Sequence, residues 1–142
     1  MKRALFFSYI FAVLTMSVMA HAEKSTYLPV TKVLTQKESW VIRVIASRST
    51  PCLTQIHPHI QAQKSNSTRL DLLVAATIPS TACAQVVGQP VDLTLDVRSL
   101  IQRSGLDIAP STIYVLRVPG VDFEMSFNSD DLDSAQIQPV SM

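Results

Sequence analysis

The chain has little glycine and no motif built from it. Its three glycines are isolated from one another among 142 residues, so the sequence contains no glycine-rich loop that could hold a phosphate. No serine lies in the Gly-x-Ser-x-Gly turn that exposes the nucleophile of many hydrolases. The sequence therefore contains no pattern of residues that is typical of a catalytic or nucleotide-binding site.

An excess of positive charge is also missing. The 12 lysines and arginines nearly balance the 11 aspartates and glutamates. Two of those cations, Lys2 and Arg3, lie in an N-terminal segment that we expect to be removed, which leaves 10 cations against 11 carboxylates, about −1. Because the phosphates of nucleic acids favour a basic surface, we expect no nucleic-acid partner.

Long apolar runs are absent except at the N-terminus. Lys2 and Arg3 precede an uncharged, mainly apolar stretch over 4–20, which ends in Ala20-His21-Ala22. A basic start, an apolar stretch and small residues at the cut are typical of a secretory signal peptide, here residues 1–22. A retained membrane anchor is the alternative, since about 17 residues is near the lower limit for spanning a bilayer. We favour cleavage and expect a periplasmic or secreted mature chain without an integral membrane segment.

Cysteine is scarce, and both cysteines, Cys52 and Cys83, remain after cleavage. An even pair in an exported chain favours one disulfide. A closed loop of about 32 residues would stabilise the fold by roughly 3–4 kcal/mol. The alternatives are two buried free thiols or a reactive cysteine, and neither cysteine belongs to the Cys-x-x-Cys motif that lowers a thiol pKa.

What the sequence does contain is an alternation of apolar and polar residues with a period of two, which predicts β-strands with one buried face. The predicted strand segments are 27–34, broken by Pro29, then 40–46, 52–62, 69–77 and 90–96, and a final hairpin of 112–118 and 121–127 that reverses at Pro119-Gly120. Six or seven short strands within about 100 residues favour an all-β sandwich of two sheets.

One short helix is predicted over 97–103. The apolar residues there change to spacings of three and four, and Gly105 follows as a stop. We therefore expect a single β-sandwich domain over 23–127. Residues 128–142, with several aspartates and little hydrophobicity, are expected to form a loose acidic tail.

Few side chains are candidates for chemistry. His57 and His59 are separated by one residue and would point to the same face of a strand, but a metal site needs three or four ligands. They are therefore only weak candidates, and we expect no metal, no other cofactor and no catalytic residue. The aromatic residues that alternate with β-branched ones are expected in the core rather than on a binding face; they are Trp40, Tyr114, Phe123 and Phe127.

Several features together resemble a loosely defined protein group. They are Pro51-Cys52, Pro79, Cys83-Ala84-Gln85, the apolar segment 91–93, and the strand 114–118 followed by Phe123. This pattern resembles small exported bacterial proteins that have an immunoglobulin-like β-sandwich and two cysteines. The resemblance implies an immunoglobulin-like sandwich of about seven strands and export. It implies no activity and no site residues.

The leading functional hypothesis is a non-enzymatic binding or assembly module that holds a protein or another envelope component. Sheet edges can accept an added strand, and the irregular segment 97–110 is a place where function could be added. The first alternative is a small metal-binding protein or hydrolase that uses His57 and His59. The second is a purely structural component of the envelope.

Overall fold

The computed structural model describes residues 24–36, 39–48, 51–79 and 88–133. The predicted signal peptide over 1–22 lies outside these ranges. So does Cys83, and the Cys52–Cys83 bridge therefore stays a prediction. The described elements are β1 (Lys24–Tyr27), β2 (Val30–Thr35), β3 (Val41–Ala46), β4 (Gln55–Gln63), β5 (Asn66–Ile78), β6 (Val91–Asp96), α1 (Val97–Arg103), β7 (Ile113–Arg117), β8 (Glu124–Asn128) and the 3-10 helix η1 (Ser129–Asp133).

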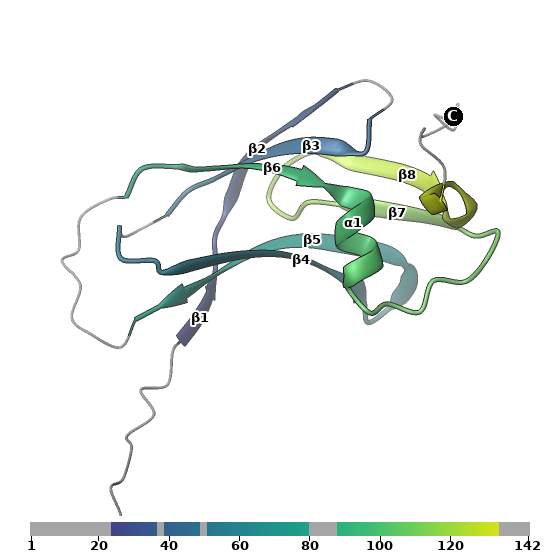
Figure 1. The fold of residues 1–142 in the computed structure, drawn as a ribbon, viewed down its shortest axis with the longest axis horizontal. Helices are drawn as coiled ribbons and strands as arrows, with labels where there is room; N and C mark the ends of the chain where they lie inside the picture. Colours follow the sequence, from purple (N-terminus) through teal and green to yellow (C-terminus); the bar gives the residue numbers. More distant parts are fainter. Residues whose placement is uncertain (1–23, 37–38, 49–50, 80–87, 134–142) are drawn as a thin grey trace, which may run out of the picture.

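The strands form two sheets that face each other (Figure 1), so the prediction of an all-β, two-sheet fold with one short helix is confirmed. One sheet has three strands in the order β2-β3-β6, and the other has five. The long β5 organises the larger sheet. It pairs with β4 along one edge, and along the other edge with β7, in parallel, and with β1. β8 then pairs with β7.

The structure has eight strands in its described part, whereas the sequence predicted about seven. The difference arises at Pro29, where the segment predicted as one strand divides into β1 and β2. Proline has no amide hydrogen and cannot donate a hydrogen bond to a ladder. Leu28 N donates to Val74 O in the larger sheet, and Ser47 N donates to Pro29 O beside the smaller one. The chain therefore moves from one sheet to the other at this point.

The buried faces of the strands are those that the alternation predicted. Alternate residues of β3, β5 and β7, together with Trp40 just before β3, point into the space between the sheets. Their buried members are Trp40, Ile42, Val44, Ala46, Leu70, Leu72, Val74, Ala76, Tyr114 and Leu116. One contiguous core results.

The helix α1 spans the residues that the sequence predicted. Asp96 caps its start, because its side chain accepts hydrogen bonds from Ser99 N at 3.3 Å and from Ser99 Oγ at 2.9 Å. Gly105 follows its end with φ +70°, a left-handed conformation that glycine adopts without strain. The buried side chains of α1 close part of the space between the sheets; they are Val97, Leu100 and Ile101.

The prediction of a loose tail from residue 128 is wrong for its described part. Ser129–Asp133 forms η1, and Leu132 is only 9% exposed and joins the core cluster. Polar contacts hold the segment in place, since Ser111 N and Oγ donate to the Asp130 carboxylate at 2.9 and 2.8 Å. A single leucine among three aspartates anchors the segment. Residues 134–142 lie outside the described ranges.

Among the described residues, no helix has the length and apolarity that a membrane crossing requires.

Candidate functional site

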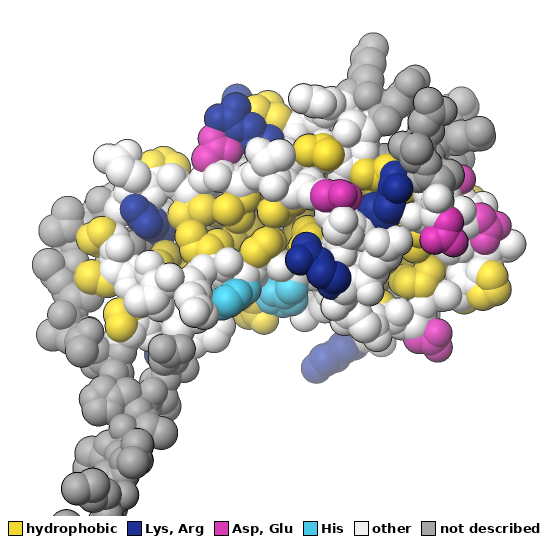
Figure 2. Space-filling view, viewed as in Figure 1, with side chains coloured by type: hydrophobic (Ala, Val, Ile, Leu, Met, Phe, Trp, Pro, Cys, Tyr) yellow, Lys and Arg dark blue, Asp and Glu magenta, His cyan; other side chains and the backbone are white. Residues whose placement is uncertain are grey.

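The sandwich is open along one side, between the edge strands β4 and β6. Among the described strands, β4 and β6 each end their sheet on this side, and they do not pair with each other. Figure 2 shows the result as a band of hydrophobic side chains exposed between the two sheets. We call four of the core-facing side chains of these two strands the apolar strip; they are Ile56 and Ile60 of β4 and Leu93 and Leu95 of β6.

Exposure along the apolar strip is uneven. Ile60 and Leu95 are buried, whereas Ile56 and Leu93 pack against the core but are only half-buried. α1 closes one end of the strip, where it packs against β4. A cavity of about 320 Å³ lies there, lined by residues 56–60 of β4 and by Leu100, Arg103 and Ser104. The strip therefore continues into a hollow beside the helix.

The backbone of β6 presents hydrogen-bonding groups along this open side. Val97 N donates to Trp40 O at 2.9 Å, which sets the alternation of the antiparallel ladder between β3 and β6. The residues that bond β3 are therefore Val91, Leu93 and Leu95, and the N–H and C=O groups of Asp92, Thr94 and Asp96 point away from it. Within the described ranges β6 is the last strand of its sheet.

The other sheet edges are interrupted or short. β2 is irregular between Val30 and Lys32, and β4 carries Pro58, which has no amide hydrogen to offer. β8 has only five residues. Its ladder with β7 continues at Ser129 N, which donates to Thr112 O. By the same alternation the backbone groups of Ser126 point outward from β8.

The side chains beside the β6 edge are acidic. Arg43 Nε donates to Asp92 Oδ1 at 2.7 Å, and the Arg43 guanidinium also pairs with Asp92 Oδ2. These hydrogen bonds lower the Asp92 pKa and raise the Arg43 pKa from their ordinary values. Asp96 is exposed and bonds Ser99 at the helix start. Positive or titratable groups border the opposite side of the strip, at Arg103 and the two histidines of β4.

His57 and His59 lie on β4, as the sequence predicted, and Figure 2 shows the two histidines in cyan beneath the apolar strip. The His57 Nε2 atom lies 3.1 Å from Gln55 Oε1. The ring of His59 contacts that of Tyr27 across the outer face of the larger sheet, with centroids 5.9 Å apart. Among the described residues, no group of three histidine, cysteine, aspartate or glutamate side chains gathers as a metal site would need. The pair therefore has no third ligand in this part of the chain.

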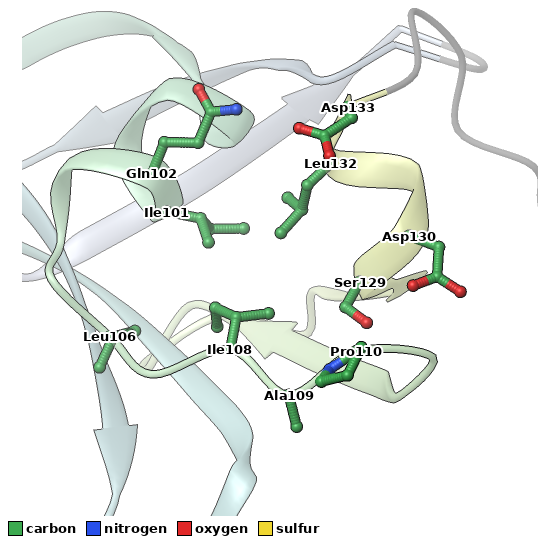
Figure 3. Close-up of a pocket in the computed structure, with 10 residues that line it drawn as sticks. All are labelled: Ile101, Gln102, Leu106, Ile108, Ala109, Pro110, Ser129, Asp130, Leu132 and Asp133. Atoms are coloured by element: carbon green, nitrogen blue, oxygen red, sulfur yellow. The ribbon is translucent and has the colours of Figure 1, made fainter.

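A second cavity, of about 350 Å³, lies between α1, residues 106–110 and η1. Figure 3 shows Ile101, Ile108 and Leu132 converging on its floor, with Gln102 and Asp133 at the rim. The backbone beside it is fixed, since Ala109 N donates to the Tyr114 hydroxyl at 2.9 Å. The sequence could not indicate this cavity, because it depends on the folding of a segment that was expected to be loose.

The aromatic residues are mostly in the core, as predicted. Trp40 is 4% exposed, and its ring meets that of Phe127 edge-on with centroids 5.4 Å apart. Tyr114 stacks on Phe127 at 5.8 Å. Phe123 is only half-buried and packs against the core from its margin. These rings fill the sandwich near α1 rather than forming a binding face.

Comparison with known proteins adds no relative: no family model, no curated protein and no solved structure matches the chain.

The sequence did not predict the apolar strip or the free β6 edge as a site. Both strands were predicted correctly, but neither the number of strands in each sheet nor the order of pairing can be derived from alternation alone. The available signal was Pro58, which favours an edge strand for 52–62.

Proposed function

We propose that the mature protein is a non-enzymatic binding or assembly module of the periplasm or the extracellular space, and that it holds a protein or another envelope component at its open side. The observation that carries the proposal is the apolar strip between β4 and β6 (Figure 2). Exposed contiguous apolar surface on a folded domain is typical of an interaction site.

Burial of the strip would supply the affinity. Covering apolar surface gains about 25 cal/mol per Å², and Ile56 and Leu93 are half-buried aliphatic side chains that already pack on the core. They are held by strands rather than by loops, so little conformational entropy is lost when a partner covers them. A partner therefore meets a surface that is already ordered.

The finer description of the fold belongs to the same proposal. An immunoglobulin-like sandwich with a Cys52–Cys83 bridge agrees with two facing sheets, although the parallel pairing of β5 with β7 departs from the mainly antiparallel sheets of that fold. The bridge is consistent with export, because oxidising compartments preserve disulfides. Mass measurement of the exported protein after thiol alkylation, with and without reduction, tests the bridge: a mature chain that alkylates at both cysteines without reduction would contradict it.

Site-specific photo-crosslinking in the producing cell tests the binding function. Benzoylphenylalanine replaces Leu93 in the apolar strip or, as the control, Leu34, which is 39% exposed on β2. We expect a discrete crosslinked product from position 93 and little from position 34, because only the strip would be covered. Equal yields at both positions, or no product at position 93, would contradict the proposal.

A further inference from the structure

We propose that the occupant of the open side is an extended segment of a partner protein, which adds to the free edge of β6 as a fourth strand of the smaller sheet. This inference rests on the binding function proposed above and specifies its geometry. The occupant alternates apolar residues, which enter the apolar strip, with polar residues that face solvent and include a lysine or arginine.

The edge position of β6 favours a strand as the occupant. β6 is the last described strand of the smaller sheet, so one more strand, paired with it at about 4.8 Å, would lie next to the apolar strip. A strand presents every second side chain to one face, which matches a narrow apolar strip. A helix would leave the outward N–H and C=O groups of β6 without partners.

The β6 backbone offers the required hydrogen bonds. Asp92, Thr94 and Asp96 each direct an N–H and a C=O away from β3, as the register and the bond from Val97 N to Trp40 O require. Strand addition uses such main-chain groups for affinity and side-chain pockets for specificity. In this protein the pockets would be the apolar strip and the cavity at its end near α1.

Charge complementarity specifies the polar residues of the occupant. The exposed side chains of β6 include Asp92 and Asp96, on the solvent face of the smaller sheet. Arg43 neutralises Asp92, whereas Asp96 bonds only neutral groups of Ser99 in the contacts described above. A neighbouring cation on an added strand would lie at cross-strand distance from Asp96, and such opposite-charge pairs stabilise a sheet.

Selection from a displayed library of nine-residue peptides against the full mature protein tests this inference. We expect the enriched peptides to alternate apolar and polar residues and to carry a cation. Their binding should protect the amides of Asp92, Thr94 and Asp96 from hydrogen exchange. N-methylation of the alternate peptide amides that pair with β6 should reduce affinity about tenfold or more, because several main-chain hydrogen bonds are lost together.

Two matched variants locate the edge. Thr94→Pro removes an outward N–H of β6 without removing a bond to β3, and should reduce peptide affinity about tenfold. Ser126→Pro removes the equivalent outward N–H from β8 and should leave the affinity within about twofold. Both variants are checked for folding by thermal unfolding. If Thr94→Pro does not fold, the methylated peptides and the exchange data on the unmodified protein decide the question.

The outcomes separate this inference from the proposed function. Peptides that bind the apolar strip, as shown by loss of binding in Leu93→Lys, but that tolerate N-methylation would overturn strand addition and leave the binding function standing. A library from which no peptide is enriched would overturn the extended segment, whereas the crosslinking at position 93 decides the binding function separately. If the protein alone sediments as a dimer and the Thr94→Pro variant sediments as a monomer, the occupant is a second copy of the chain. That result would overturn the partner segment.

Discussion

The region of the sandwich near α1 and the side between β4 and β6 have the same two sheets but differ in how their cores are closed. Near α1, the rings of Trp40, Tyr114 and Phe127 pack together, and Arg98 lies over Trp40 at 5.4 Å from the ring centroid. Along the open side, Ile56 and Leu93 are only half-buried. The difference shows that the core is closed where aromatic side chains and a helix cover it, and stays partly open where two edge strands face each other without pairing.

The largest expected effect concerns the closed region. Phe127→Ala should lower the free energy of unfolding by about 3–5 kcal/mol, because a fully buried ring that contacts two other rings is lost and a cavity remains. Urea unfolding followed by tryptophan fluorescence measures it, since Trp40 contacts the site. A loss below about 1 kcal/mol would contradict the tight packing of this region.

The second expected effect tests whether η1 belongs to the closed region. Leu132→Ala should cost about 2–3 kcal/mol, because Leu132 is 9% exposed and joins the core. Asp133→Ala, at the exposed end of the same helix, is the control and should change stability by less than about 0.5 kcal/mol. If both variants lost similarly little stability, the segment would be the loose tail that the sequence predicted.

The open side should respond more weakly to the same chemical change. Leu93→Ala should cost only about 1 kcal/mol, since a half-buried leucine loses about half of its transfer free energy. Leu72→Ala, at a fully buried position of β5, should cost about 2–5 kcal/mol. Chemical unfolding of the two variants under identical conditions measures the contrast. Equal losses would mean that the apolar strip is as well covered as the core.

The smallest effect is a pH dependence at the rim of the open side. The hydrogen bond from Arg43 lowers the Asp92 pKa below its ordinary value of 3.8. The pair therefore adds stability above that value and loses it as the pH falls through the lower pKa of the folded state. Asp92→Asn should be slightly less stable than the unmodified protein at pH 7, as expected for an exposed pair.

At pH 3, below the ordinary pKa of 3.8, that difference should be smaller than at pH 7, because Asp92 is then largely protonated in the unfolded chain. Urea unfolding of both proteins at the two pH values measures it, with Asp122→Asn, in the turn after β7, as the control. A difference that grew on acidification would have the wrong sign.

Features encoded by neighbouring residues were predictable. The helix was predicted with the bounds that the structure has, because the spacing of Val97, Leu100 and Ile101 and the stop at Gly105 act within a few residues. The buried face of β5 followed from its alternation. Leu132 was missed, because a single leucine beside several aspartates has no periodicity to detect.

The amino-acid sequence by itself determined where most of the strands lie, where the helix begins and ends, and which face of most strands is buried. These properties follow from backbone stereochemistry and from apolar periodicity along one segment. Tertiary structure alone decided how strands pair, that the chain changes sheets at Pro29, and that five strands face three. Pairing depends on contacts between distant segments, and the apolar strip that supports the proposed function exists only because those pairings leave β4 and β6 as edge strands that do not pair with each other.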